Sequence, residues 1–404
     1  MDLSEFFSIQ AGLVSRVAGL RKRFLAGKIN WNKRMMGIYG ARGTGKTTML
    51  LQHLALQNRQ EQEYLYISAD HIRVQAIGLY EIASYFFRLG GKVIIIDEVH
   101  KYANWSQEVK NLYDAFTDTR ILFSGSSTLG LQKGKADLSR RAVFYNLPGL
   151  SFREYVYLAQ GLDFKPVSLP DLLKSHTSVA SKILETGPIL GHFKNYLEYG
   201  IYPFFLEGIE DYFSKLLNVL EKVLYEDIPT VTGIKTGNVP VLKRMLWLIA
   251  TSQPFIPNIE RMSRNLNISK EYVYTYLHSL ERAGLLSGFL PAESGYRLVR
   301  KPSKIYMENT NLLRAVAGEV GGRDEEAGSR RETFFANQLK SVRLDVRIPI
   351  MGDFLVEGKY LFEIGGKGKG KSQIERAKNA FVVRDGIEVG FDNIIPLWLF
   401  GFLY

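Results

Sequence analysis

The sequence predicts an α/β fold in which helices cover both faces of a parallel sheet. Two observations in the first 150 residues predict it. Short apolar segments of strand length alternate with longer segments of helical periodicity, and the short segments are apolar at successive positions. Strands buried on both faces have this pattern, and an alternation of strands and helices places neighbouring strands parallel.

The predicted elements follow one another in order. The first 30 residues are expected to be helical, because apolar residues recur at helical spacing on one face, namely Phe6, Leu13, Val17, Leu20 and Phe24. The expected strands lie at 35–39, 64–68, 93–96, 121–124 and 143–147. The expected helices lie at 47–57, 79–89 and 105–116. After Pro148 the alternation of strands and helices stops, and residues 151 to about 235 are expected to be mostly helical.

The bulk composition limits the size and the chemistry of the protein. The chain has 404 residues, which favours about two to four domains. It contains no cysteine, which excludes disulfides, thiolate zinc sites and cysteine nucleophiles. The N-terminus lacks the layout of a signal peptide, and no apolar run reaches the length of a membrane span. We therefore expect a cytoplasmic protein without a membrane partner.

The net charge of +11 makes nucleic acid a candidate partner, because a basic protein attracts polyanions. The charge is spread along the chain rather than gathered in one run. A solvated basic surface that also attracts nucleotides therefore explains it equally well, and the charge alone leaves both interpretations open.

A phosphate-binding loop is predicted between the first expected strand and the helix that follows it. Residues 40–47 read Gly-Ala-Arg-Gly-Thr-Gly-Lys-Thr and match G-x-x-x-x-G-K-[ST]. Glycines let backbone N–H groups surround phosphates, and the helix N-terminus adds partial positive charge. Lys46 should reach the β- and γ-phosphates of ATP, and Thr47 should ligate Mg²⁺. The residues expected to bind the nucleotide are Gly40, Arg42, Gly43, Thr44, Gly45, Lys46, Thr47 and Thr48.

Two acids end the third expected strand, Lys-Val-Ile-Ile-Ile-Asp97-Glu98. The carboxyl edge of an open parallel sheet is where ligands bind, so Asp97 should lie beside the phosphate loop and hold magnesium. Glu98 can then polarise the attacking water. Taken alone, Asp-Glu after a strand would indicate an ordinary turn, but the upstream loop favours the catalytic interpretation.

Residues near two further expected strands are candidates for catalysis. Ser124 and Ser126 end the fourth expected strand, where a side chain could sense the γ-phosphate or orient water, although a serine-rich turn explains either residue nearly as well. Arg140 and Arg141 precede the last expected strand, and one of them could stabilise the transition state, acting in cis or from a neighbouring subunit.

The phosphate-loop pattern recurs at residues 365–372, but we do not interpret it as a second ATP site. Only about thirty residues follow it, too few for further parallel strands and a magnesium carboxylate. Lys367 and Lys369 would also crowd the interior of such a loop. A flexible basic loop that contacts phosphates is the better interpretation.

Residues 241–306 are expected to form a winged helix, with three helices followed by two short strands. The expected third helix is capped by Ser269, carries a buried stripe of Val273, Leu277 and Leu280, and presents Lys270, Tyr274 and His278 on another face. The expected wing carries Arg297, Arg300, Lys301 and Lys304. DNA binding and packing between domains are both compatible with this pattern. Any DNA binding should be weakly sequence-specific and salt-dependent.

Several stretches together resemble a prokaryotic family of AAA+-type P-loop ATPases. They are GARGTGKTTML, IIIDEVHKYANWSQEVKNLYD, ILFSGSS, DLSRRAVFYNLPGLSFREY, NYLEYGIYPFF and FEIGGKGKGKSQI. In that family a P-loop domain precedes a winged helix and a C-terminal domain of unknown function that looks like a PD-(D/E)xK nuclease. The resemblance implies phosphate-loop, magnesium and water-activating roles for Lys46, Thr47, Asp97 and Glu98, and it places the family's arginine at Arg141.

The predicted organisation has five parts. They are an N-terminal helical segment (1–30), a P-loop ATPase domain (31–150), a helical lid or linker region (151–235), a winged helix (236–306) and a small α+β nuclease-like domain (307–404). The acidic, glycine-bearing stretch at 318–329 is the best candidate for a linker.

The resemblance also implies acids for a nuclease site, at Glu332, Asp353 and Glu363, with a lysine two residues after the last acid. Gly365 stands at that position, and Lys367 comes two residues late. We therefore predict that the C-terminal domain binds divalent metal poorly and cuts no DNA.

The leading hypothesis is a magnesium-dependent ATPase that couples nucleotide state to domain rearrangement, with DNA as a candidate surface of action. One alternative is a nucleotide-dependent switch that binds a protein partner, or another copy of itself, and hydrolyses little. The other is an ATP-regulated DNA nuclease or mobile-element factor. The sequence has no N-K-x-D motif for reading guanine, which disfavours a GTPase.

Overall fold

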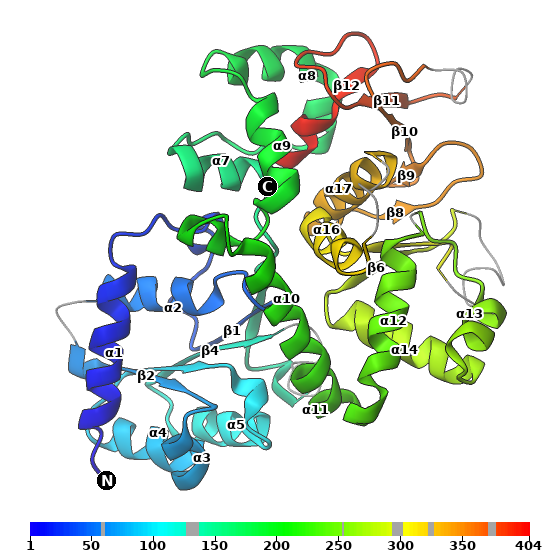
Figure 1. Cartoon of the computed structure of the whole chain (residues 1–404). Helices are drawn as coiled ribbons and strands as arrows, with labels where there is room; N and C mark the ends of the chain where they lie inside the picture. The colour runs from blue at the N-terminus through cyan, green and yellow to red at the C-terminus, as the bar shows by residue number, and fades with distance from the viewer. Residues whose placement is uncertain (58–60, 127–136, 253, 293–301, 322–326, 371–376) are drawn as a thin grey trace. The chain divides into compact units, whose positions relative to one another are not determined.

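The computed structural model describes residues 1–57, 61–126, 137–252, 254–292, 302–321, 327–370 and 377–404 (Figure 1). The chain divides into two compact units, Met1–Gly149 and Leu150–Tyr404. Within the described ranges, none of the helices is both long enough and apolar enough to cross a membrane.

The first unit is built on a five-stranded parallel sheet with the strand order β2-β3-β4-β1-β5. The strands are β1 (Met35–Gly40), β2 (Tyr64–Ser68), β3 (Val93–Asp97), β4 (Arg120–Ser126) and β5 (Val143–Asn146). Each predicted strand is confirmed, with ends displaced by two residues at most. Because all the strands are parallel, their carboxyl ends meet at one edge of the sheet, and the candidate site lies there.

Helices cover both faces of this sheet, as the sequence predicts (Figure 1). They are α1 (Ser4–Val17), α2 (Lys46–Ala55), α3 (Ile72–Ile77), α4 (Leu79–Arg88) and α5 (Trp105–Ala115), with 3-10 turns η1 (Phe24–Gly27), η2 (Glu61–Glu63) and η3 (Val99–Lys101). Successive residues of β3 alternate between two cores. Ile94 and Ile96 pack with α4 and α5, whereas Val93 and Ile95 pack with α2. This alternation explains why the strands are apolar at every position.

The N-terminal segment belongs to the first unit and closes one edge of its sheet. In α1, the Gln10 side chain donates to Tyr64 O (3.3 Å) and accepts from Tyr66 N (2.7 Å), so it satisfies backbone groups of the edge strand β2. The predicted helical character of the first 30 residues is confirmed for α1 and for the 3-10 turn η1, but residues 18–23 are not helical and Leu20 is 49% exposed. The chain turns there, which brings Arg23 to the phosphate loop.

The second unit begins with helices and ends with a mixed sheet. Its first helices and helical turns are α7 (Phe152–Gln160), α8 (Leu169–Leu184), α9 (Leu190–Tyr199), η4 (Pro203–Glu207), α10 (Tyr212–Lys222), the π-helical turn η5 (Val223–Asp227), α11 (Ile228–Thr232) and η6 (Thr236–Asn238). The predicted helical character of residues 151–235 is therefore confirmed. The end of the chain packs on α7, where the side chains of Ser151 and Arg153 both donate to Tyr404 O (2.9 and 2.8 Å).

Residues 239–307 follow the order predicted from the sequence. Three helices, α12 (Val239–Ala250), α13 (Ile259–Leu266) and α14 (Lys270–Arg282), precede the antiparallel strands β6 (Leu286–Phe289) and β7 (Lys304–Met307). Ser269 caps α14 by accepting from Tyr272 N (3.3 Å), and the predicted stripe of Val273, Leu277 and Leu280 is buried. The winged-helix assignment itself stays a prediction, and Arg297, Arg300 and Lys301 lie outside the described residues.

The described residues of the C-terminal part form an α+β arrangement of two helices and five short strands. The helices are α16 (Thr310–Glu319) and α17 (Ala327–Ser341). The strands are β8 (Val346–Arg347), β9 (Phe354–Val356), β10 (Tyr360–Gly365), β11 (Ala380–Arg384) and β12 (Ile394–Pro396), followed by the 3-10 turn η7 (Leu397–Phe402). The sheet order is β12-β11-β10-β9-β8, with β10, β11 and β12 parallel. The predicted boundaries near residues 235 and 306 fall inside the second compact unit and stay predictions.

Candidate functional site

The predicted phosphate loop connects β1 to α2 and requires its glycines. Gly43 and Gly45 have φ values of 85° and 90°, a conformation that side chains disfavour. A Cβ at Gly40 would lie 2.2 Å from Leu147 O, so the end of β1 can lie this close to the residue after β5 only without a side chain. The loop therefore has the backbone geometry that surrounds phosphates.

Lys46 opens α2 and points its ammonium group at the loop. Its Nζ donates to Gly40 O and Ala41 O, both at 3.0 Å, and the residue is only 4% exposed. Thr44 is buried within the loop, and its Oγ1 donates to Ala41 O (2.9 Å). Thr47 and Thr48 follow in the first turn of α2, where unpaired N–H groups favour anions.

Asp97 lies beside the loop, at the carboxyl end of β3. Its carboxylate accepts from Thr47 Oγ1 (2.6 Å), from the hydroxyl of Tyr66 (2.9 Å) and from the hydroxyl of Ser124. Burial raises the pKa of the Tyr66 phenol, and the charge of Asp97 raises it further, so Tyr66 acts as a donor. Thr47 and Asp97 thus bring together two oxygen atoms of the hard kind that magnesium prefers.

Glu98 follows Asp97 in a left-handed backbone conformation, with φ at 52°. This conformation is uncommon for residues other than glycine and often marks functional sites. Its Oε2 is buried, lies 3.9 Å from Arg42 and 3.4 Å from His100 Nε2, and accepts no hydrogen bond from the described residues. The carboxylate therefore retains a buried oxygen that can accept a hydrogen bond from water.

The two serines at the end of β4 occupy different positions. Ser124 donates to Asp97 and accepts from Glu98 N (3.3 Å), so it supports the acidic pair. Ser126 pairs in register with Gly40, at the level where the loop begins. Its hydroxyl lies 2.9 Å from His100 Nε2. Of the two, Ser126 is therefore the better placed to respond to a phosphate.

Arg141 lies at the opposite edge of the sheet from the phosphate loop. Val143 pairs with Met36, four residues before Gly40, so Arg141 is roughly 20 Å along the strands from the loop. There it forms a two-pronged ion pair with Asp114, with both N–O distances at 2.9 Å. This placement does not fit action of Arg141 on a nucleotide held by its own chain.

Three residues that contact the site were missed by sequence reasoning. Tyr66 donates to Asp97, His100 lies between Ser126 and Glu98, and Arg23 donates to Thr44 O and to Pro148 O (2.9 Å). His100 had a usable signal, because it stands two residues after Glu98. Tyr66 lies on the strand next to β3 but carries no motif, and Arg23 is brought to the loop by tertiary folding alone.

The predicted acids of the C-terminal part lie around Lys369, with Glu332 on α17, Asp353 just before β9 and Glu363 on β10, although these three described side chains do not converge closely enough to hold a metal ion by themselves. Tyr306 donates to Glu332 (2.6 Å), and Lys304 lies 3.5 Å from it. Burial raises the pKa of Glu332; Lys304 opposes this rise and Asp353 adds to it. We call these three acids the carboxylate cluster.

A lysine accompanies this cluster, but it stands at neither of the positions considered from the sequence, Gly365 and Lys367. Lys369, rather than Lys367, reaches Glu363, with Nζ 2.5 Å from Oε1, and this bond raises the pKa of Lys369. A Cβ at Gly365 would lie 2.5 Å from Cβ and Cγ of Lys369, so the glycine leaves room for the lysine stem. Lys304 and Lys369, both expected to contact DNA phosphates, are thus paired with carboxylates. Lys371 lies outside the described residues.

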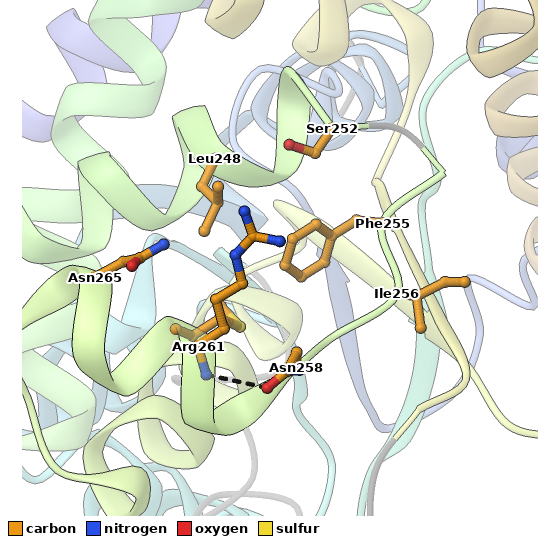
Figure 2. A pocket seen from close by; sticks show the side chains of 8 residues that line it. Leu248, Ser252, Phe255, Ile256, Asn258, Arg261 and Asn265 are labelled. Carbon is orange, nitrogen blue, oxygen red and sulfur yellow. Dashed lines mark hydrogen bonds between the residues drawn. The ribbon is translucent and has the colours of Figure 1, made fainter.

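A separate pocket of about 250 Å³ lies between α12 and α13 (Figure 2). Figure 2 shows the Arg261 side chain between Leu248 and Phe255, while Asn258 accepts from Arg261 N (3.0 Å). The lining contains neither a carboxylate nor a histidine. Nothing in it resembles an acid–base site.

Metal binding at the phosphate loop would depend on few protein ligands. In the ranges that the structure describes, no three histidine, aspartate or glutamate side chains converge closely enough to hold a metal ion by themselves. Magnesium is commonly coordinated by one or two protein oxygens together with substrate phosphates and water, and the pair of Thr47 and Asp97 is compatible with that coordination.

Comparisons with known proteins agree with this geometry in part of the chain. Residues 32–156 match the AAA domain family, and residues 190–321 match a domain of unknown function (DUF8612). No curated protein matches the chain. The first match covers the sheet, the phosphate loop and the acidic pair, so the chain contains an AAA-type P-loop domain of the nucleotide-binding class.

Several solved structures are similar to this chain at low identity. DnaA from Aquifex aeolicus bound to AMPPCP has a TM-score of 0.28 and 12% identity, covering 70% of this chain and 89% of that chain. A replication initiator DnaA bound to AMPPCP and single-stranded DNA has a TM-score of 0.28 and 14% identity, covering 68% and 86%. C. elegans PCH-2 has a TM-score of 0.26 and 14% identity, covering 69% and 68%.

Proposed function

We propose that this protein is a magnesium-dependent ATPase that couples its nucleotide state to domain rearrangement. The observation that carries the proposal is the hydrogen bond of 2.6 Å between Thr47 Oγ1 and Asp97 Oδ2. It joins the phosphate loop to the acidic end of β3, although the two residues lie 50 positions apart in the chain. A glycine-rich turn without a nucleotide-binding role would not be expected to lie in hydrogen-bonding contact with a carboxylate at the end of β3.

Each residue of the site has a role that follows from its position. Lys46 binds the β- and γ-phosphates with its ammonium group, and the N–H groups of residues 43–48 surround them. Thr47 and Asp97 would hold magnesium, which neutralises phosphate charge when bound. Glu98 accepts a proton from the attacking water through its buried oxygen, and Ser126 contacts the γ-phosphate.

The test is steady-state ATP turnover by the purified full-length protein, in magnesium and in EDTA, with and without DNA. We expect turnover that requires magnesium and is lost in Lys46→Ala. Stimulation by DNA that weakens as salt rises would support DNA as the surface of action. ATP binding without turnover in every condition would favour the nucleotide-dependent switch with a protein partner.

We further propose that Arg141 acts on the nucleotide of a second copy of this chain. The test mixes two inactive variants, Lys46→Ala, which lacks the phosphate-binding lysine, and Arg141→Ala, which lacks the arginine. Activity should reappear in the mixture, because one chain supplies the nucleotide site and the other the arginine. Arg140→Ala serves as the matched control and should stay active by itself. Full activity of Arg141→Ala would remove the arginine from the mechanism.

A second candidate function, ATP-regulated DNA cleavage, is favoured by one observation, the placement of Lys369 over Gly365 beside Glu363. Asp353 and Glu363 would hold a divalent cation there, and Lys369 would supply positive charge near the reacting phosphate. Because Lys369 already neutralises Glu363, we keep the expectation that the cluster cuts nothing. Cleavage of supercoiled or single-stranded DNA in magnesium or manganese, lost in Asp353→Ala, would establish the nuclease instead.

A further inference from the structure

His100 lies where the acidic end of β3 meets the end of β4. It belongs to the short turn η3 and is 7% exposed. Its Nδ1 accepts from Ser126 N (3.2 Å), and its Nε2 lies 2.9 Å from Ser126 Oγ and 3.4 Å from Glu98 Oε2. One imidazole ring therefore contacts both the residue proposed to activate water and the residue proposed to sense phosphate.

The hydrogen bonds define which nitrogen of His100 carries the proton. A backbone N–H can only donate, so Nδ1 must be an unprotonated acceptor for Ser126 N. The proton of the neutral ring is then on Nε2, which lies 2.9 Å from Ser126 Oγ and faces Glu98 Oε2 at 3.4 Å. A Ser-His-Glu nucleophile would need the carboxylate on Nδ1, so this arrangement is not a hydrolase triad.

Glu98 needs such support more than an ordinary carboxylate does. Its backbone is in the left-handed region, and its buried Oε2 accepts no hydrogen bond within the described part of the chain. Arg42 is 3.9 Å away and belongs to the phosphate loop itself. The Nε2 atom of His100 lies closer to Glu98 Oε2, at 3.4 Å. The ring is held in place by Ser126, at the buried end of β4.

We propose that His100 is a positioning residue for ATP hydrolysis, which links the carboxylate of Glu98 to the phosphate-sensing end of β4 at Ser126. This inference rests on the proposed ATPase function. Movement of Ser126 toward a phosphate would move the His100 ring, because the backbone N–H and the hydroxyl of Ser126 each contact one ring nitrogen. The ring would then move the Glu98 carboxylate with it. His100 would thus affect the rate of hydrolysis and leave the binding of ATP unchanged.

Two substitutions test the roles of the two ring nitrogens of His100 separately. In His100→Gln, the side-chain amide reaches the place of Nε2 and keeps a donor for Glu98. In His100→Asn, the shorter amide keeps only an acceptor near the place of Nδ1. His71 supplies the matched control, because its Nδ1 also accepts a backbone amide, from Arg73 (3.3 Å).

The experiment measures kcat, the Kd for ATP and the Tm of His100→Asn, His100→Gln and His71→Asn. We expect His100→Asn to lose roughly 10- to 100-fold in kcat with an unchanged Kd, since misplacement of a reacting group by about 1 Å can cost 100-fold. His100→Gln should keep most of the wild-type kcat, and His71→Asn should keep all of it.

Each contrary outcome has a separate meaning. Wild-type kcat in His100→Asn, or equal losses in both His100 variants, would overturn the positioning role while wild-type turnover keeps the proposed function. A parallel loss of ATP affinity and Tm would show a structural role instead and also overturn the inference. If wild type itself does not turn over, the ATPase proposal fails, and the role of His100 fails with it.

Discussion

Asp97 ends β3 in the first unit and Glu363 lies within β10 in the second, and each of these carboxylates is 2% exposed, yet their partners differ. Asp97 accepts hydrogen bonds from the hydroxyls of Thr47, Tyr66 and Ser124. Glu363 receives the ammonium group of Lys369. Neutral donors support a buried carboxylate and leave its negative charge in place, whereas an ammonium group cancels that charge.

This difference in charge indicates that the two sites differ in their affinity for a cation. The first site keeps a net attraction for a cation that arrives with a nucleotide. The carboxylate cluster has part of its charge neutralised from within. A metal ion would have to compete with Lys369 there. The comparison therefore favours nucleotide chemistry in the first unit and a structural role for the cluster.

The largest difference should appear when each site loses an aspartate. Asp97→Asn removes the proposed magnesium ligand, and it replaces one carboxylate oxygen, an acceptor, with an amide donor beside three hydroxyls. We expect turnover to fall roughly 100-fold or more, since metal stabilisation is worth several kcal/mol. Asp353→Asn should leave turnover within error of wild type in the same assay. Equal losses in both variants would abolish the distinction between the two sites.

Substitution of Lys46 should change the affinity for ATP, whereas substitution of Lys369 should change the stability of the second unit. Lys46→Ala should weaken ATP binding about 10- to 100-fold, the worth of a hydrogen bond to a charged group. Lys369→Ala should leave ATP binding unchanged and destabilise the second unit by about 1–3 kcal/mol, because Glu363 is left buried without its ammonium partner. Calorimetric titration with ATP and thermal unfolding measure the two effects. Loss of ATP affinity in Lys369→Ala would contradict the comparison.

The two units should also respond to pH in opposite directions. Burial lowers the pKa of His53, which stacks on Trp31, from 6.5 to about 4. Because the folded pKa is depressed, its contribution to stability is present above pH 6.5 and is lost as pH falls toward 4. Unfolding followed between those pH values should show a loss of stability that His53→Gln reduces.

Glu332 gives the opposite prediction, and a smaller one, because Lys304 opposes the rise in its pKa. The folded pKa lies above the ordinary value of 4.5, so its contribution is present below pH 4.5 and is lost as pH rises through the folded pKa. Glu332→Gln should therefore be more stable relative to wild type at pH 7 than at pH 4. Glu388→Gln, at an exposed acid, is the control and should show no such difference.

Much of the first unit could be predicted from sequence because its signals are local. Continuous apolar segments located β1 to β5 within two residues, and the spacing of the loop and the Asp-Glu pair placed Lys46, Thr47 and Asp97 at one edge. The residues that were missed act over long separations. Arg23 reaches Pro148 across 125 positions, and no periodicity records such a contact.

The lysine of the carboxylate cluster was misplaced for a different reason. Counting along an extended strand points to residue 365 or 367, but the chain turns after β10, where Lys369 N donates to Gly366 O (2.9 Å). The turn brings the Lys369 side chain back over Gly365. The absence of a side chain at Gly365 looked like the loss of a function, whereas in the fold it provides space for another residue.

The most direct test of the central claim is the Glu98→Gln variant, assayed for ATP retention and for phosphate release on the same sample. The amide preserves the shape of the side chain and accepts a proton poorly, so we expect unchanged magnesium-dependent ATP binding and a loss of turnover of roughly 100-fold or more. ATP trapped on the protein without phosphate release is the predicted result. Phosphate release at the wild-type rate would contradict the assignment of this edge of the sheet as the site of hydrolysis.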